Sequence, residues 1–305
     1  MSERINDPGF GAKYSRRTKR IINKDGSFNV KREGIDTGLR SLYEALIGMN
    51  VLPFMAIVAA VYFLLNAFFA TLYFLNGVEY LNGAEPTGGI QDWLTCFYFS
   101  FQTFTTVGYG ALSPMGTTAN VIAAFEALLG LLGFALATGL LYGRFSKPRA
   151  KLLYSNQVLI APFQDGEALM FRVTNKRSNV LMEMEARVIL MIKDDPMTPH
   201  QRSYYRLKLQ VEKIHFLPLS WTIVHPIDEE SPLFNLSDKQ LLESEAEVLI
   251  LIMGFDDTFN QVVHSRHSYT IEEFVRNAKF EMPYEIDEDG DVVMNINQIH
   301  KYKKL

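Results

Sequence analysis

Two long uncharged runs dominate the first half of the chain. Residues 53–75 contain no Asp, Glu, Lys or Arg, and residues 117–142 contain only Glu126. Because a helix rises 1.5 Å per residue, each run can cross a hydrocarbon core of ~30 Å. The pattern therefore predicts two membrane-spanning helices. A charged side chain in lipid costs ~2.5–3.5 kcal/mol, so we expect Glu126 to face protein or a water-filled cavity.

A shorter apolar stretch lies between the two runs. Residues 92–104 (DWLTCFYFSFQTF) are too few for a third span, and they end next to residues 106–110 (TVGYG). Non-helical backbone is tolerated at membrane depth only where protein buries it or where it lines water. The spacing predicts a re-entrant helix that places this pentapeptide inside a pore.

The pentapeptide acts through its backbone. TVGYG is the sequence with which known potassium channels ring a dehydrated potassium ion, using carbonyl oxygens from four loops. Its glycines adopt left-handed dihedrals without strain, so successive carbonyls can turn toward one axis. One chain supplies one strand of carbonyls, and a closed symmetric assembly completes the ring. We expect a homotetramer, three identical partners per chain, that binds K⁺ at Thr106, Val107, Gly108, Tyr109 and Gly110.

Basic residues gather on one side of the predicted spans. Residues 1–40 and 144–151 are rich in Lys and Arg, whereas the loop at 76–92 has neither. The positive-inside rule then places both termini in the cytoplasm. The single cysteine, Cys96, excludes an intrachain disulfide and fits a reducing compartment. The net charge of −4 argues against a nucleic-acid binder.

From residue 157 onward the helical pattern gives way to short segments rich in β-branched and aromatic residues. Turn signals such as Asp165-Gly166 and Asp289-Gly290 separate them. This spacing is typical of an all-β, two-sheet sandwich of immunoglobulin-like architecture. Ser237 is expected to cap a short helix over residues 237–245. Strands are predicted at 158–163, 168–175, 180–192, 204–211, 221–227, 246–255, 261–270 and 291–299.

A further amphipathic segment precedes the first span. Residues 36–48 place Leu39, Leu42, Tyr43, Leu46 and Ile47 on one helical face. Such a helix lies in the membrane interface or packs on protein. The chain therefore divides into an N-terminal segment (1–35), an interfacial slide helix (36–49), a pore domain (50–146), a linker (147–156) and a β-sandwich (157–305).

This order of elements resembles the inward rectifier potassium channels, especially their prokaryotic branch. Residues 23–30 (NKDGSFNV), 137–139 (ATG), 144–150 (RFSKPRA) and 227–234 (IDEESPLF) carry the resemblance. Voltage-gated channels share the TVGYG sequence, but this chain lacks an arginine-rich sensor span. The resemblance implies a passive potassium-selective channel of a bacterial inner membrane, gated from the cytoplasmic side. It implies no cofactor besides potassium ions in the pore.

The resemblance also assigns roles within the pore. Gln102 stands where the family usually has Glu. In the family that Glu pairs with an Arg just after GYG, where this chain has Ala111 and Leu112. Support from Gln102 and Thr105 would then be a neutral hydrogen bond or uncharged packing. Phe134 occupies the cavity position that is Asp in strong rectifiers, which implies weak block by polyamines or Mg²⁺. Tyr142 matches the family's gate position, with an ordinary interfacial tyrosine as the alternative.

Other candidates keep two interpretations each. In the cavity, Glu126 attracts cations or supports the filter, or it is a hydrogen-bonded residue at a helix interface. The glycines of the second span are hinges or close-packing positions; they are Gly130, Gly133 and Gly139. The basic cluster binds anionic or phosphoinositide headgroups or only sets topology; it comprises Arg144, Lys147, Arg149 and Lys151.

In the β-domain the resemblance places Glu183 on the cytoplasmic ion path. Residues 254–259 would form a constriction loop, in which Asp256 or Asp257 faces the ions or both are exposed turn residues. The chain lacks a G-x-S-x-G, P-loop or Rossmann motif, and His264 and His267 lack metal-ligand spacing, so an enzyme is not predicted. A poorly selective cation channel and a membrane-anchored receptor that does not conduct remain as alternatives.

Overall fold

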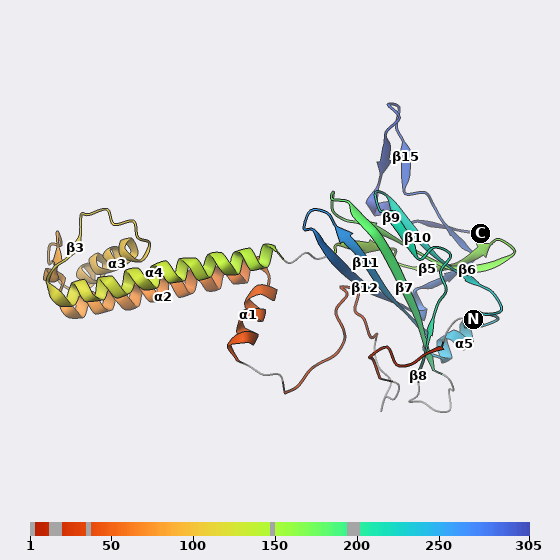
Figure 1. The fold of residues 1–305 in the computed structure, drawn as a ribbon, viewed down its shortest axis with the longest axis horizontal. Coiled ribbons are helices and arrows are strands. Elements are labelled where there is room, and N and C mark those ends of the chain that lie inside the picture. Colours follow the sequence, from red (N-terminus) through yellow and green to blue (C-terminus); the bar gives the residue numbers. More distant parts are fainter. Residues whose placement is uncertain (1–3, 12–19, 35–37, 147–149, 194–201) are drawn as a thin grey trace. The chain divides into compact units, whose positions relative to one another are not determined.

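The computed structural model describes residues 4–11, 20–34, 38–146, 150–193 and 202–305 (Figure 1). The chain forms two compact units. One, the helical unit, comprises residues 34–147, and the other, the β unit, comprises residues 1–33 with 148–305.

The described residues of the helical unit form four helices, which follow the predicted order. They are α1 (Leu39–Gly48), α2 (Val51–Asn76), α3 (Ile90–Phe104) and α4 (Gly116–Phe145). By length and composition, α2 and α4 are able to cross a membrane. Pro53 lies in the first turn of α2, where its missing N–H breaks no helical hydrogen bond. Between these helices lie a 3₁₀ turn (Val78–Tyr80) and the short paired strands β2 (Leu81–Asn82) and β3 (Ser113–Pro114).

The core of the helical unit lies where α3 packs between α2 and α4. Its buried members include Phe69 and Tyr73 of α2 and Cys96 and Phe99 of α3. The rings of Tyr73 and Phe99 meet edge to face, with centroids 4.9 Å apart. Few other residues of α2 and α4 are buried within one chain. Most of their apolar surface is thus left for lipid or for other subunits.

The β unit consists mainly of two sheets. The larger runs β1-β8-β7-β11-β12, with β9 also on β7, and the smaller runs β10-β6-β5-β13, with β4 on β6. Their bounds are β1 (Arg4–Ile5), β4 (Leu152–Tyr154), β5 (Val158–Phe163), β6 (Gly166–Asn175), β7 (Leu181–Lys193), β8 (Arg202–Arg206), β9 (Lys213–Phe216), β10 (Ser220–Ile227), β11 (Glu247–Asp256), β12 (Gln261–Thr270) and β13 (Phe274–Arg276).

Four smaller strands and one helix complete this unit. Strands β14 (Ala278–Phe280) and β17 (Tyr302–Lys304) pair, and β15 (Tyr284–Ile286) and β16 (Val292–Met294) form a hairpin. Two 3₁₀ turns lie at Ile271–Glu273 and Ile296–Gln298. Helix α5 (Asp238–Glu243) begins with a capping box, in which the Ser237 and Gln240 side chains each bond the other's backbone N–H.

Alternating side chains of both sheets fill one core. On β6 these are Leu169, Phe171 and Val173, and on β11 they are Val248, Ile250 and Ile252. Because side chains alternate along a strand, the residues between them lie on the opposite face of each sheet, where Leu249 is buried in a second cluster with Ile21 and Ile22. The β-rich sandwich predicted from this period is therefore present.

Two predicted strands differ from the structure. The strand predicted at 204–211 ends at Arg206, although Leu207 and Leu209 remain buried. The Leu207 N–H still bonds Val188 of the larger sheet, but the Gln210 N–H bonds Val224 of the smaller sheet. The chain bonds the smaller sheet at this one point and then returns to the larger sheet as β9, while its burial pattern continues, so the pattern does not reveal the end of β8. The strand predicted at 291–299 keeps only β16, and a 3₁₀ turn follows.

A buried histidine makes the β unit sensitive to acid. His267 stacks on Tyr154, with ring centroids 4.4 Å apart, and burial, aided by Arg20 and opposed by Glu273, lowers its pKa to about 4. An unfolded histidine titrates near ~6.5, so only the unfolded chain takes up this proton as the pH falls toward 4. The free energy of unfolding should therefore fall by up to about 3 kcal/mol over that interval.

Thermal unfolding of the purified protein against pH tests this expectation. The unfolding temperature of wild type should drop more steeply below ~6.5 than that of H267F, whose ring still stacks but does not titrate. Parallel curves for the two proteins would contradict the assignment to His267.

Candidate functional site

The TVGYG segment follows α3 directly and has an alternating backbone. Thr106, Gly108 and Gly110 have positive φ values of 61°, 51° and 84°, whereas Val107 and Tyr109 do not. Alternation between right- and left-handed residues turns neighbouring peptide groups the same way. A positive φ is unfavourable for the β-branched Thr106, and such strain concentrates at functional sites. This backbone is suited to presenting a row of carbonyl oxygens.

The end of α3 holds the inner part of this segment from behind. The carbonyl oxygen of Gln102 accepts the N–H groups of Val107, at 3.0 Å, and Gly108, at 3.3 Å. The Thr106 N–H bonds the Thr103 carbonyl at 3.0 Å. Carbonyls at a helix C-terminus have no partner within the helix, so they are free to accept these bonds. The N–H groups are thereby used on the helix side, which leaves the segment's own carbonyls free.

The side chains predicted to support the segment act differently. The Thr105 hydroxyl donates to the Phe101 carbonyl at 2.7 Å, within its own helix. The side-chain Oε1 of Gln102 is buried and has no hydrogen-bond partner among the described residues. Within one chain, Gln102 therefore holds the segment through its backbone, and support from its side chain stays a prediction.

Glu126 lies in a polar cluster between three helices. It is fully buried on α4, and its Oε2 accepts the Tyr73 hydroxyl of α2 at 2.6 Å. Its Oε1 accepts the Ser100 hydroxyl of α3, and Ser100 Oγ also lies 3.2 Å from Asn66 Oδ1 of α2. The assignment of Glu126 to the cavity is therefore wrong, because its own chain covers it completely. Its bond to Ser100 of α3 agrees both with a hydrogen-bonded residue at a helix interface and with support of the filter, which stays a prediction.

Gly130 lies against the C-terminal end of α3. A Cβ atom built on Gly130 would stand 2.1 Å from the Phe104 carbonyl oxygen, far inside any normal contact. Gly133 would only touch the Phe104 ring, at 3.8 Å, and Gly139 faces open space. Helix α4 continues through all three glycines. Gly130 thus serves close packing, and hinges at Gly133 or Gly139 stay predictions.

The other pore candidates of α4 lie on its exposed surface. The side chains of Phe134 and Tyr142 are among the most exposed large apolar residues of the chain. Nothing within one chain covers them, so they are available to line a pore formed by several chains. Their roles as cavity and gate residues stay predictions.

Arg144, predicted to bind headgroups, contacts its own chain in the structure. Its Nη1 donates to the Leu46 carbonyl at 2.7 Å and its Nη2 to the Met49 carbonyl at 2.6 Å. Its guanidinium also lies 4.7 Å from the centre of the Phe54 ring. Within one chain Arg144 thus bonds the end of α1, and its contact with lipid headgroups stays a prediction. Lys147 and Arg149 lie outside the described residues, and Lys151 is exposed.

The acidic candidates of the β unit differ in exposure. Glu183 is exposed, and its Oε1 lies 3.0 Å from His215 Nδ1. Asp256 is only 1% exposed, and its Oδ1 accepts the N–H groups of Thr258 and Phe259. It therefore holds the turn after β11 and does not face an aqueous path or solvent, contrary to both sequence interpretations. Asp257 is exposed on that turn and stays a candidate.

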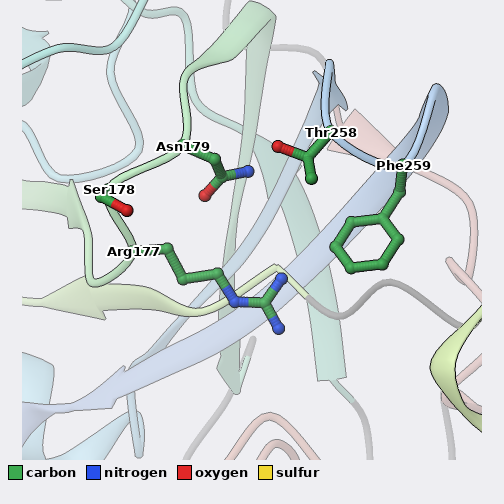
Figure 2. Close-up of a pocket in the computed structure, with 5 residues that line it drawn as sticks. All are labelled: Arg177, Ser178, Asn179, Thr258 and Phe259. Carbon is green, nitrogen blue, oxygen red and sulfur yellow. The ribbon is translucent and has the colours of Figure 1, made fainter.

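The turn that carries Asp257 borders a cavity that sequence reasoning missed. Its volume is about 550 Å³, and residues of two turns line it (Figure 2). The Arg177 guanidinium extends toward Phe259 and lies 5.7 Å from the ring centre. No sequence signal links these turns, because they are far apart in the chain and follow different strands. The lining residues are Arg177, Ser178, Asn179, Thr258 and Phe259.

Within the described part of the chain, no cluster of three or more His, Cys, Asp or Glu residues is arranged to hold a metal ion. Backbone carbonyl oxygens, such as those of residues 106–110, are a different kind of ligand that a cation can use. Carbonyl rings of this kind replace the hydration shell of an ion without changing it chemically.

Comparisons with known proteins cover both units. The family described as "Inward rectifier potassium channel C-terminal domain" matches residues 152–305, and the family described as "Ion channel" matches residues 51–147. The chain is 34% identical over 296 residues to the inward rectifier potassium channel Kirbac3.1 of Paramagnetospirillum magnetotacticum, covering 95% of this chain and 98% of that protein.

Animal proteins are more distantly similar. The G protein-activated inward rectifier potassium channel 4 of Homo sapiens is 24% identical over 305 residues, covering 92% of this chain and 72% of that protein. Channel 2 of the same type from Mus musculus is 24% identical over 310 residues, covering 94% and 72%. The similarity therefore spans the helical and β units together.

Proposed function

The chain belongs to the inward rectifier potassium channel family, and from this premise we propose that residues 106–110 form the filter of a homotetrameric pore. Potassium ions pass down their gradient through rings of carbonyl oxygens, one strand from each chain. The observation that carries this proposal is the alternating backbone of the segment, whose inner N–H groups bond α3.

Four copies also explain the surfaces that one chain leaves open. Val107 and Tyr109 of the filter are exposed within one chain, as is most apolar surface of α2 and α4. A filter backbone at membrane depth must be buried by protein or line water. Neighbouring copies around a closed axis cover the exposed apolar surface and enclose the filter backbone along a water-filled path.

The remaining roles belong to the same proposal. The channel lies in a bacterial inner membrane, and both termini are in the cytoplasm. Four Tyr142 side chains, one from each chain, close the cytoplasmic end of the pore. Phe134 offers no carboxylate to a polyamine or to Mg²⁺, so rectification is weak. Asp257 and Glu183 attract cations along the cytoplasmic path. Lys147, Arg149 and Lys151 bind anionic headgroups, each contributing about 1 kcal/mol near the surface.

Reversal potentials of the reconstituted channel test the filter. With K⁺ on one side and Na⁺ on the other, we expect the potential to follow the K⁺ gradient. A potential that follows Na⁺ equally well would favour a poorly selective cation channel, which the unpartnered Gln102 Oε1 motivates. Barium-sensitive rubidium uptake into liposomes separates both channels from a receptor. Folded tetramers without uptake would overturn the proposal.

A further inference from the structure

Helix α3 holds only one half of the filter segment. The carbonyl oxygen of Gln102 accepts the N–H groups of Val107 and Gly108. The N–H groups of Tyr109 and Gly110 make no hydrogen bond to the described part of the chain. A backbone segment with few hydrogen bonds opens easily. The shape of this second half therefore depends on how the chain is held directly after the filter.

Residues 111–115, which follow the filter, are held by residues 80–84 of the loop between α2 and α3; we call this contact the clasp. Within it, strand β2 pairs with strand β3 in antiparallel register. Next to this pair, the Met115 N–H donates to the Tyr80 carbonyl oxygen at 2.8 Å. The exit from the filter is thus bonded to a part of the chain that precedes the pore helix.

Apolar side chains fasten both strands of the clasp to the core of the helical unit. Leu81 of β2 is 2% exposed and belongs to the core cluster that contains Tyr73 and Phe99. Leu112, directly before β3, packs against the same cluster. Because a two-stranded pair is marginal by itself, this packing is what keeps the clasp closed.

Gly83 lies at the closest approach within the clasp. A Cβ atom built on Gly83 would stand 2.1 Å from the carbonyl oxygen of Ala111 and 3.3 Å from its carbonyl carbon. Gly83 also has a φ of +87°, which glycine adopts readily. Ala111 follows the filter residue Gly110 directly. A side chain at position 83 would therefore displace the peptide group through which the chain leaves the filter.

We propose that Gly83 is a positioning residue of the filter, which allows the clasp to fix the half that contains Tyr109 and Gly110. The inference rests on the proposed function, because it takes this half to coordinate K⁺. Selective binding depends on how many carbonyl dipoles surround the ion and where they lie. Displacing Ala111 moves the carbonyls that precede it and weakens K⁺ binding. One half of the filter is then set by α3 and the other by the clasp.

Two alanine substitutions separate the close contact at Gly83 from the cost of its backbone conformation. Gly88 lies in the same loop and has a φ of +91°, but no atom lies within 4 Å of a Cβ built there. G83A and G88A therefore place alanine in the same unfavourable region of φ, and only G83A presses on Ala111.

Calorimetric titration of the purified tetramer with K⁺ measures the effect, with N-methylglucamine as the replacement cation. We expect the K⁺ dissociation constant of G83A to rise by about tenfold or more, and that of G88A to stay within about twofold of wild type. A merely structural role would lower the unfolding temperature of G83A without changing its dissociation constant. An unchanged constant in G83A would therefore overturn the proposal.

A cross-link tests the clasp even if G83A does not assemble. Asn82 Nδ2 donates to Ser113 Oγ across the β2–β3 pair at 3.4 Å, so these side chains meet. Asn82→Cys with Ser113→Cys, in a Cys96→Ala background, places two thiols there. The oxidised protein should bind K⁺ at least as tightly as the same sample after reduction, because the clasp is closed when the filter holds ions. Weaker binding after oxidation would overturn the proposal.

The same titrations distinguish a failure of this inference from a failure of the proposed function. If wild type binds K⁺ no more tightly than Na⁺, the filter assignment fails and the inference fails with it. If wild type prefers K⁺ while G83A and G88A bind it equally, the filter stands and the positioning role of Gly83 is wrong.

Discussion

Replacing Gly130 with alanine is expected to abolish selective potassium flux. The new methyl group would stand 2.1 Å from the carbonyl oxygen of Phe104, so α4 or the end of α3 must move. Phe104 is the last residue of α3, and the filter follows after Thr105. Overpacking of this kind costs about 1–3 kcal/mol or more, and here the strain falls on the filter's support.

Rubidium uptake and thermal unfolding of the tetramer measure this effect. Gly139→Ala is the matched control for stability, because it makes the same change on the same helix with no atom within 4 Å. There, alanine should stabilise the helix by up to about 1 kcal/mol. The uptake of G139A separately tests the hinge assigned to that position. Normal uptake and stability in G130A would show that the two helices do not pack closely at this point.

Removing the carboxylate of Glu126 is expected to destabilise the assembled channel most strongly among side-chain changes. In E126L the Tyr73 hydroxyl loses its acceptor in a buried site, and the Ser100 hydroxyl loses one acceptor while Asn66 still offers another. Each buried polar group left without a partner costs about 1–3 kcal/mol. E126Q keeps one acceptor and should lie between E126L and wild type in unfolding temperature.

Tyr73→Phe provides the cycle that isolates this interaction. Removing both partners of a buried hydrogen bond costs less than removing one, so E126L combined with Y73F should be less destabilised than the sum of the two changes. An additive result would mean that the carboxylate does not depend on Tyr73. Equal stability of E126Q and E126L would likewise contradict the cluster.

Features set by local pattern could be predicted from the sequence. The uncharged runs gave the two long helices, and alternation gave the main strands of the β unit, because both depend on the periodicity of burial. The three-residue strands β13, β14, β15 and β17 were missed because three residues are too few to show a period. The TVGYG segment was recognised because its function depends on backbone geometry that its glycines encode locally.

Interactions between distant residues could not be predicted in the same way. The sequence indicates that the Glu126 carboxylate must face either protein or water. That its partners are Tyr73 and Ser100 follows only from the packing of α2 and α3 against α4. Asp256 looked like an exposed turn residue, yet its carboxylate caps the turn from inside. Arg144 was read as a membrane-surface charge because nothing near it in sequence reveals the carbonyls of α1.

The anchoring of the filter is unequal along its length. Gln102 fastens the N–H groups of Val107 and Gly108, whereas no hydrogen bond to the described part of the chain holds those of Tyr109 and Gly110. In the tetramer proposed above, neighbouring chains are, besides the clasp, the remaining protein source of order for the half of the segment that contains Tyr109 and Gly110. The shape of that half would then depend on assembly as well, whereas α3 holds the half that contains Val107 and Gly108 within each chain.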